Sequence, residues 1–317
     1  MNKTLLKTLK ILLPILLGVF LIGYSLSKLS FQELLGYFKT ADYTYVILGL
    51  LLGLLSHLSR AYRWLFMLEP MGYKVKLGNS IMAVFATYLI NYTIPRAGEV
   101  ARASILTNYE NVPFDKGFGS IVAERVADLI VLLMIIAVTL FLQFDFIYSF
   151  FIEKFNPSKL ILGASIFLVF ALLFFFIIKR SKAGIGLKIK QFVNGLIEGA
   201  LSIFKMKKKW AFIFHTLFIW TMYLSMFYVT SLSVSGLNTV PIGAILVGFI
   251  LATFSIAATN GGIGSYPEAV VIAFLLFGLS EDPSRAFGWI MWTSQTVMII
   301  ILGGMSLLYL PIYNRKK

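Results

Sequence analysis

The sequence predicts an all-α integral membrane protein, and three observations lead to that fold class. Of the 317 residues, 59% are hydrophobic and only 13% are charged, a composition outside the range of soluble domains. The mean hydropathy is high, at +0.86. The apolar residues also gather in long runs, and a helix that crosses a ~30 Å hydrocarbon layer needs about 20 of them. We therefore expect a single polytopic membrane domain over residues 1–317.

Unbroken apolar runs predict six full transmembrane helices, the first of which is retained rather than cleaved as a signal peptide. In chain order the runs cover residues 9–27, 45–68, 121–144, 160–178, 211–234 and 287–310. Between the fourth and fifth runs, residues 179–209 carry an apolar stripe at helical spacing among basic residues. That pattern is typical of a helix at the membrane surface, so we expect an interfacial connector there.

Two further apolar segments are each broken near the middle by proline, glycine and a carboxylate. The first segment, 79–107, is broken at 91–99, and the second, 242–279, is broken at 260–268. In a membrane protein, irregular backbone is tolerated only where it is buried in protein or lines a wet cavity. We therefore interpret both segments as broken re-entrant helical hairpins whose breaks mark substrate sites. This pattern favours a transporter over an enzyme.

Basic residues indicate how these elements are oriented. The net charge is +14, and most Lys and Arg fall in loops on one side of the predicted helices, including Lys3, Lys74, Lys76 and the stretch 179–209. Because positive charge concentrates in cytoplasmic loops, we expect a multi-pass protein of the plasma (inner) membrane with both termini cytoplasmic. Topology and attraction to anionic lipids account for the excess charge, so no nucleic-acid partner is expected.

These orientations arrange the elements as an inverted repeat. Residues 43–144 and 209–310 each contain a span, a broken hairpin and a second span, and the two sets run in opposite directions. The first hairpin is expected to enter from the cytoplasm and the second from the exterior. Such a pair places a site near the bilayer midplane, where the hairpin ends meet, and it supports alternating access.

The first break carries three charged candidates for substrate binding. Arg96, Glu99 and Arg102 follow one another at i, i+3 and i+6 on a half-helix that we expect to begin at Pro95, since proline is favoured at a first helical position. A helix N-terminus with guanidinium forks suits a phosphate or carboxylate head group. The alternative is an internal Arg–Glu pair that only neutralises buried charge.

Three more charges open the span that follows the first hairpin. Glu124 and Asp128 lie at i, i+4 with Arg125 between them, and carboxylates so spaced repel each other, so each needs a cation. The available partners are Arg60, Arg63, Arg96 and Arg102. A structural clamp between hairpin and span and a direct role in substrate or proton handling are both open.

The second break combines backbone freedom with a carboxylate. Gly261, Gly262 and Gly264 allow left-handed backbone beside Asn260. Glu268 has the S-x-x-E spacing of a capping box with Ser265, which makes it a helix cap; the alternative is a carboxylate that titrates or binds a cation. The glycines are not a nucleotide cradle, because the strand and lysine of a P-loop are missing.

Other reactive groups are scarce. The chain has no cysteine and two histidines, His57 and His215, which we interpret as helix–helix hydrogen-bonding residues. With no H-E-x-x-H pattern, no metal or other cofactor is expected. The five tryptophans, Trp64 among them, are interpreted mostly as interfacial aromatics.

Four segments of the chain together resemble one family. They are 60–64 (RAYRW), 95–102 (PRAGEVAR), 124–128 (ERVAD) and 261–269 (GGIGSYPEA). With these motifs in this order, the chain resembles the lysylphosphatidylglycerol synthase transmembrane family, a group of flippase-like membrane proteins. The resemblance covers nearly the whole chain. Unlike the bifunctional members of the family, the protein is expected to lack the soluble aminoacyl-transfer domain. Lipid aminoacylation is therefore not expected.

Taken together, these observations predict a flippase-like transporter that moves an anionic amphipathic lipid, of phospholipid or polyprenyl-phosphate type, by alternating access. One alternative is a membrane enzyme that acts on lipid-linked substrates, although the predicted exterior loops are short and contain no D-x-D motif. A second alternative is a lipid-binding scaffold for a partner lipid-modifying enzyme. The oligomeric state is left open.

Overall fold

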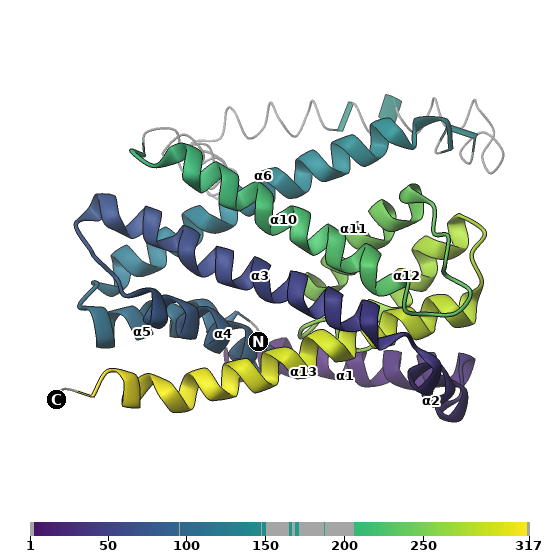
Figure 1. Ribbon diagram of the computed structural model, residues 1–317, viewed down its shortest axis with the longest axis horizontal. Helices are drawn as coiled ribbons and strands as arrows, with labels where there is room; N and C mark the ends of the chain where they lie inside the picture. The colour runs from purple at the N-terminus through teal and green to yellow at the C-terminus, as the bar shows by residue number, and fades with distance from the viewer. Residues whose placement is uncertain are drawn as a thin grey trace. The chain divides into compact units, whose positions relative to one another are not determined.

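Figure 1 shows the computed structural model, which describes residues 3–94, 96–146, 148–149, 165–166, 169–170, 187 and 206–315. Within these residues the chain is helical and contains no strand. In chain order the helices are α1 (Lys3–Lys28), α2 (Phe31–Thr40), α3 (Tyr43–Leu68), the 3-10 helix η1 (Glu69–Met71), α4 (Leu77–Thr93), α5 (Ala97–Glu110), α6 (Phe114–Leu142), α10 (Lys209–Ser231), α11 (Ile242–Ala258), α12 (Ser265–Leu276) and α13 (Glu281–Tyr313). The all-α fold class is confirmed for this part of the chain.

The chain divides into two compact units, Met1–Glu124 with Trp210–Lys317, and Arg125–Lys209. The first unit holds all the predicted site residues except Arg125 and Asp128. In the second unit, the described residues belong mainly to the later part of α6. The predicted span 160–178 and the predicted connector 179–209 fall largely outside the described residues.

Four helices in the described ranges are long and apolar enough to cross a membrane: Tyr43–Met71, Phe114–Leu142, Lys209–Ser231 and Glu281–Tyr313. They coincide with four of the predicted runs, and a fifth run lies within the 26-residue α1. The helices of the two predicted hairpins are shorter, α11 having 17 residues and α12 having 12. A multi-pass membrane protein follows, while the number of six spans and the re-entrant path of the hairpins stay predictions.

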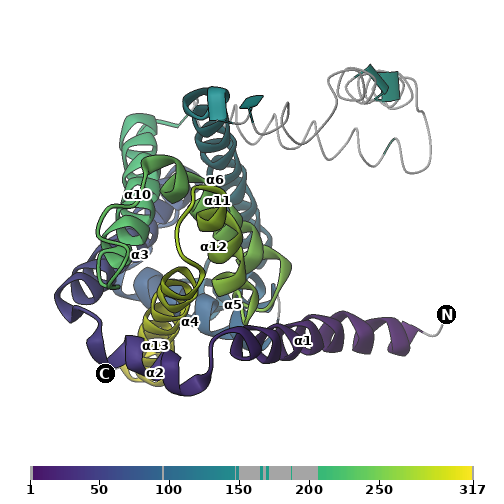
Figure 2. The same cartoon turned by 90° about the vertical axis from the view of Figure 1, so that its right-hand side faces the viewer.

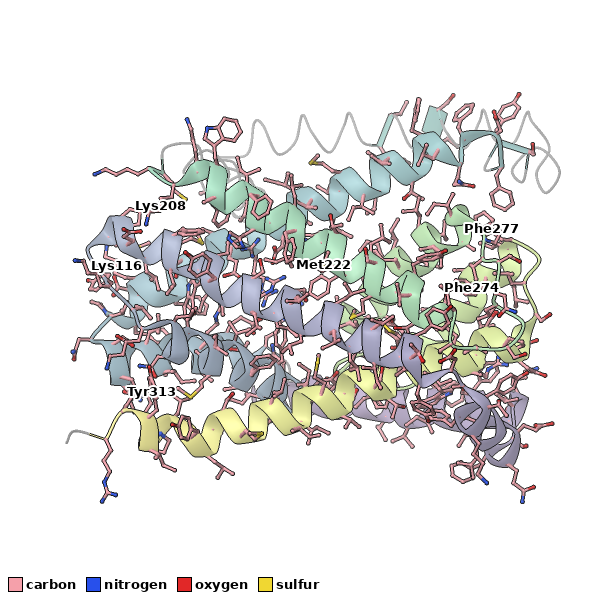
Figure 3. All side chains as sticks on the ribbon, viewed as in Figure 1. Lys116, Lys208, Met222, Phe274, Phe277 and Tyr313 are labelled. Atoms are coloured by element: carbon pink, nitrogen blue, oxygen red, sulfur yellow. The ribbon has the colours of Figure 1, made fainter. Side chains whose placement is uncertain are left out.

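Large apolar side chains face outward along the long helices. On α13, Ile300, Ile301 and Leu308 are exposed, Leu308 to 75%, and Figure 3 shows such side chains projecting from the helices. Soluble proteins rarely carry extended apolar surfaces of this kind, because water solvates them poorly. Lipid tails solvate them well, so these faces suit contact with a bilayer.

The first predicted hairpin is present as α4 and α5, which pack against each other. Its break differs from the expectation that the second helix begins at Pro95. Arg96 has φ 62°, a left-handed conformation that ends helical geometry, so α5 begins at Ala97. The Asn91 side chain then accepts a hydrogen bond from the Gly98 N–H at 2.8 Å, supplying the acceptor that a helix start lacks.

The second predicted hairpin is present as α11 and α12, which also pack against each other. Between them Gly261, Gly262 and Gly264 have φ values of 65°, 82° and 68°. This left-handed backbone is costly for residues with a side chain and ordinary for glycine, as the sequence predicted. The glycines thus turn the chain within a few residues.

Helix α13 contacts both hairpins along its 33 residues. Near its start, Gly288 lies against Pro267 of α12, and later Gly303 lies against Leu89 of α4. Beyond its end, Asn314 exchanges hydrogen bonds of 2.8 and 2.7 Å with Asn79. Figure 1 shows the two hairpins toward opposite ends of α13, and Figure 3 places Tyr313 toward one end with Phe274 and Phe277 of the α12 region toward the other.

Helices α3 and α10 lie side by side in both ribbon views (Figures 1 and 2). The Tyr223 hydroxyl lies 3.3 Å from Nδ1 of His57, and the Ser59 hydroxyl lies 2.8 Å from Nδ1 of His215. Both histidines therefore make hydrogen bonds between helices, as predicted. These bonds fix the face of α3 that carries the arginines.

Candidate functional site

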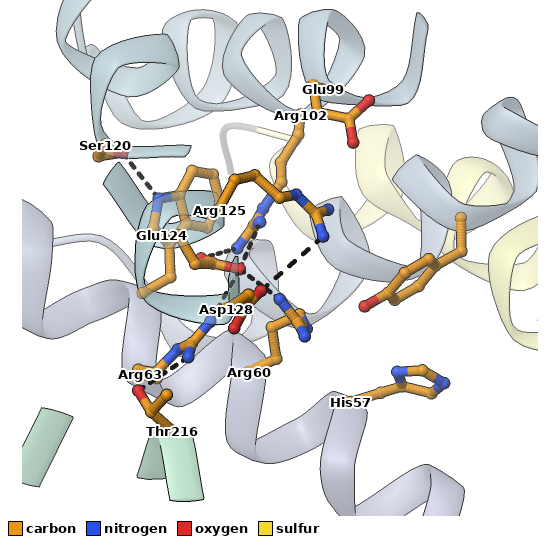
Figure 4. A network of polar contacts seen from close by, with 12 residues as sticks. His57, Arg60, Arg63, Glu99, Arg102, Ser120, Glu124, Arg125, Asp128 and Thr216 are labelled. Atoms are coloured by element: carbon orange, nitrogen blue, oxygen red, sulfur yellow. Dashed lines mark hydrogen bonds and ion pairs between the residues drawn. The ribbon is translucent and has the colours of Figure 1, made fainter. Parts of the chain in front are cut away.

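A buried carboxylate, Glu124 of α6, is the centre of a cluster of buried ion pairs in the first unit (Figure 4). Arg60 Nη1 lies 2.9 Å from Glu124 Oε1, Arg63 Nη2 lies 3.3 Å from the same oxygen, and Arg102 Nη2 lies 3.1 Å from Oε2. Each of the four side chains is at most 4% exposed. We call these residues the Arg–Glu cluster. Desolvating such charges is expensive, so their close pairing is required for stability.

Two helices besides α6 supply the arginines. Arg60 and Arg63 lie at i, i+3 on α3, which places them on one helical face, and Arg102 comes from α5 of the first hairpin. The ion pair between Arg102 and Glu124 therefore joins the hairpin to the following helix, with the geometry of the predicted clamp. The predicted pairing of Glu124 with arginines is confirmed.

Trp64 forms one wall of the cluster. The Arg102 guanidinium carbon lies 3.8 Å from the centre of the Trp64 ring, a cation–π contact. The indole N–H donates a 2.8 Å hydrogen bond to Ser120 Oγ. Trp64 is fully buried, so the interpretation of this residue as interfacial is wrong. It lies one turn after Arg60, on the face of α3 that packs inward.

Helix α10 also contacts the cluster. Arg63 donates a 2.8 Å hydrogen bond to the Thr216 hydroxyl, and its guanidinium lies 5.2 Å from the Phe212 ring. The cluster thus connects α3, α5, α6 and α10 through buried polar contacts. Movement of any one of these helices has to rearrange charged groups, and this makes the cluster sensitive to conformation.

Arg96 and Glu99 lie apart from this centre. Arg96 precedes the first turn of α5 and is exposed, so it does not continue the helical spacing that the sequence predicted for Arg96, Glu99 and Arg102. Glu99 accepts hydrogen bonds from the Asn91 amide at 3.3 and 3.5 Å. Arg102 directs its guanidinium to Glu124 instead. The structure thus separates an exposed cation at the hairpin end from a buried one.

Arg125 and Asp128 belong to the second unit. Asp128 is buried, and its Oδ2 lies 3.9 Å from Nη1 of Arg125, whose side chain is 40% exposed. The need of Asp128 for a cation is therefore met in part by a neighbour on its own helix. Sequence reasoning considered only the other four arginines for this role.

The second hairpin contradicts the capping-box interpretation of Glu268. The N-cap residue of α12 is Gly264, and no side chain accepts a capping hydrogen bond there. Ser265 is therefore the first helical residue, and Glu268 lies one position beyond the one that a capping box requires. The Ser265 hydroxyl lies 2.8 Å from that of Thr259.

Glu268 is paired with an arginine that sequence reasoning missed. Arg285 of α13 donates to it through Nε at 3.0 Å and through Nη2 at 3.2 Å, and it also donates to Glu281 at 2.8 Å. Arg285 is 1% exposed, although it follows two acidic residues, Glu281 and Asp282, at the start of α13. The i, i+4 spacing of Glu281 and Arg285 was the available signal.

The ends of the two hairpins meet. The Tyr92 ring at the end of α4 lies so close to Gly261 that a Cβ there would collide with it. The Gly261 carbonyl accepts a 2.8 Å hydrogen bond from Trp292, and the hydroxyls of Tyr92 and Thr296 lie 3.2 Å apart. The neighbouring Asn260 is 3% exposed. The depth of this contact in a membrane stays a prediction.

Metal ligands do not gather in the described part of the chain. No group of three or more His, Asp or Glu side chains there is arranged to hold a metal ion. The charged groups described above, guanidinium and carboxylate, can form ion pairs and hydrogen bonds with a ligand.

Buried ion pairs among outward-facing apolar helices define a polytopic helical membrane protein. The chain belongs to the lysylphosphatidylglycerol synthase TM region family, which matches residues 11–304. It is similar to Glycosyltransferase AglD of Haloferax volcanii, with 31% identity over 100 residues, and to the UPF0104 membrane protein MJ1595 of Methanocaldococcus jannaschii, with 33% identity over 87 residues. The matches cover 31% and 26% of this chain and only 16% and 26% of those relatives. No solved structure matches the chain significantly.

The first relative corrects one expectation. Sequence reasoning held that the chain is not an enzyme, because its loops are short and contain no D-x-D motif. A relative named a glycosyltransferase overturns that conclusion. The family is described by a lipid-synthase membrane region, and the second relative is named a membrane protein, so both support a function in the membrane.

Proposed function

We propose that this protein is a flippase-like transporter that moves an anionic amphipathic lipid across the membrane. The observation that carries the proposal is the Arg–Glu cluster, in which three guanidinium groups are buried beside the first hairpin. Ionisable residues inside a membrane are expensive and mark substrate pathways. Guanidinium forks match the geometry of phosphate oxygens, so a phosphate-bearing lipid is the substrate class that this chemistry fits best.

Arg96 makes the first contact with the head group in this proposal. It is exposed at the end of the hairpin, and its left-handed backbone holds it outside the regular helix. The head group then competes with Glu124 for Arg102, as both present oxygen atoms to the same fork. The acyl tails stay in the bilayer against the outward apolar faces.

Alternating access would separate the hairpin ends. In the structure the Tyr92 ring lies against Gly261, and this contact closes the space between the two breaks. Rocking of the repeat 43–144 against the repeat 209–310 would open it. Arg125, Asp128, Asn260, Gly262 and Gly264 complete the proposed substrate-binding set.

Lipid movement in reconstituted vesicles tests the proposal. Vesicles contain the protein with fluorescent phosphatidylglycerol, a fluorescent polyprenyl phosphate or fluorescent phosphatidylcholine, and the fraction reaching the opposite leaflet is measured. The two anionic lipids should move faster than phosphatidylcholine. Arg96→Ala should slow movement roughly tenfold to a hundredfold, the value of one charge-assisted hydrogen bond.

Conservative variants sharpen this test. Arg96→Lys and Arg102→Lys should recover only part of the rate, because a lysine keeps the charge but loses the bidentate fork. Lys39→Ala, an exposed change on α2, is the matched control. The substrate site is wrongly placed if Arg96→Ala and Arg102→Ala both fold and move lipid at the wild-type rate.

A second candidate is a membrane enzyme that acts on lipid-linked substrates, and the similarity to a glycosyltransferase favours it. Mass spectrometry of the same vesicles, supplied with a nucleotide sugar, separates the two candidates. A chemically altered lipid supports the enzyme, and an unaltered lipid in the opposite leaflet supports transport. Lipid that binds without moving or changing supports a scaffold for a partner enzyme.

A further inference from the structure

Arg285 lies between two carboxylates that differ in exposure. It holds Glu268 of α12 through two hydrogen bonds of 3.0 and 3.2 Å, and Glu281 through one of 2.8 Å. The Glu268 side chain is 11% exposed, whereas that of Glu281 is 45% exposed. We call these three residues the outer triad. It joins the second hairpin to α13.

One guanidinium group does not neutralise two carboxylates. With both ionised, the outer triad carries a net charge of −1, and a proton is the simplest cation that removes it. Arg285 Nη1 is buried and makes no hydrogen bond within the described residues. That nitrogen can take up a new contact when the pairing changes. The triad thus contains one more carboxylate than arginine, and one Arg285 N–H group that is available to donate a hydrogen bond.

No second cation pairs with the triad among the described residues. Helix α11, packed against α12, contains no ionisable side chain. The Lys28 ammonium of α1 lies over the Tyr24 ring at 5.8 Å. The ionisable side chains on the elements that contact α12 are Lys3, Lys7, Lys10, Tyr24 and Lys28 of α1, Lys209, His215, Tyr223 and Tyr228 of α10, and Glu281, Asp282, Arg285, Tyr309 and Tyr313 of α13, with Tyr266 on α12 itself. Tyr92 of α4 interacts electrostatically with Tyr266, and α2, which contacts α13, carries Glu33, Tyr37 and Lys39.

In the outer triad, the positive and negative partners are exchanged between the hairpin helix and the long helix, compared with the first hairpin. There, Arg102 on the second hairpin helix pairs with Glu124 on the following long helix. In the second hairpin, Glu268 is on the hairpin helix and Arg285 is on the long helix. Arginines outnumber the carboxylate around Glu124, and carboxylates outnumber the arginine around Glu268. The first cluster therefore suits an anion, and the second suits a cation.

We propose that the outer triad binds the proton that drives lipid movement, an inference that rests on the proposed transport function. A proton from the exterior adds to one Glu268 oxygen and forms an O–H bond. The Arg285 guanidinium then pairs with Glu281 alone, and the charge-assisted hold of α13 on α12 is lost. The second hairpin is released, and the same proton leaves to the opposite side. One anionic head group and one proton together carry no net charge across the membrane.

Vesicles with an imposed pH difference test this proposal, with the membrane potential clamped by potassium and valinomycin. At one proton per lipid, a difference of one pH unit should shift the distribution of fluorescent phosphatidylglycerol between leaflets about tenfold, toward the side to which protons flow. An encapsulated pH dye should record proton movement that depends on this lipid. In Glu268→Gln the lipid should reach the same distribution with and without the pH difference.

Asp282→Asn is the matched control, because this neighbouring carboxylate lies outside the triad, and it should keep the tenfold shift. If the wild-type protein moves lipid to the same distribution with and without the pH difference, the proton-binding role of the triad is wrong, whereas the transport function is still supported. Lipid that does not move at all overturns both. The wild-type response and its proton movement decide the matter even if Glu268→Gln fails to fold.

Discussion

Arg102 shows how a helical membrane protein accommodates a buried permanent charge. Its guanidinium is enclosed by the face of Trp64 on one side and the carboxylate of Glu124 on another. The aromatic quadrupole and the anion each stabilise the cation inside the protein, where its side chain is 1% exposed. Removing either neighbour leaves a buried charge with less compensation, and this explains why a large aromatic residue lies so deep in the protein.

Trp64 therefore gives a graded prediction. Trp64→Phe keeps an aromatic face but loses the hydrogen bond to Ser120, so the unfolding free energy should fall by about 0.5–1.5 kcal/mol. Trp64→Ala also leaves a cavity and should cost about 3–5 kcal/mol. Thermal unfolding of the purified protein in detergent measures both. Ser120→Ala is the control for the hydrogen bond, and a Trp64→Ala variant as stable as wild type contradicts the role of the ring.

At the scale of elements, the sequence predicted where the helices are interrupted more closely than which charged residues pair. The predicted segment 242–279 corresponds to α11 and α12, because three glycines within four residues, at 261, 262 and 264, adopt a left-handed backbone that a helix cannot continue through. The register at each break was missed: the left-handed Arg96 delays the start of α5, and Gly264 replaces Ser265 as the residue before α12. Such one- and two-residue shifts depend on tertiary contacts.

Pairing across sequence distance was only partly predictable. That Glu124 needs arginines followed from charge alone, and α3 and α5 supply them. The choice of Arg102 over Arg96 depends on where α5 begins. Arg285 was missed because it lies 17 residues from Glu268 and its burial comes from packing between α12 and α13.

The contact between hairpin ends gives a prediction at this scale. Gly261→Ala should push the ends apart, because the new Cβ collides with the Tyr92 ring and φ is 65°. The combined change with Tyr92→Ala should recover part of the lost stability, and a double-mutant cycle measures the coupling. Gly278→Ala is the matched control, since φ there is 75° and nothing lies within 4 Å of the added Cβ. Additive effects of the two changes contradict the contact.

For the whole molecule, topology is the decisive prediction. The chain contains no cysteine, so single introduced cysteines can be labelled cleanly with an impermeant reagent. Cysteines at Lys39 and Asp282 should react from outside, whereas one at Lys76 should not. Outside the described residues, Phe155 should react and Lys188 and Lys317 should not. A cysteine at Asn111 that reacts from outside would make the first hairpin a true crossing and remove the inverted repeat.

The ion pair between α5 and α6 also constrains how the protein is made. After Arg102 has been synthesised, the ribosome must add 22 more residues before its partner Glu124 is made. At about 5–20 residues per second, this takes roughly 1–4 s. An unpaired arginine costs about 2.5–3.5 kcal/mol at the centre of a membrane helix. We therefore expect nascent α5 to remain at the membrane surface or against Trp64 of α3 until α6 has been made. Insertion of this hairpin is then expected to be a cooperative event that involves three helices.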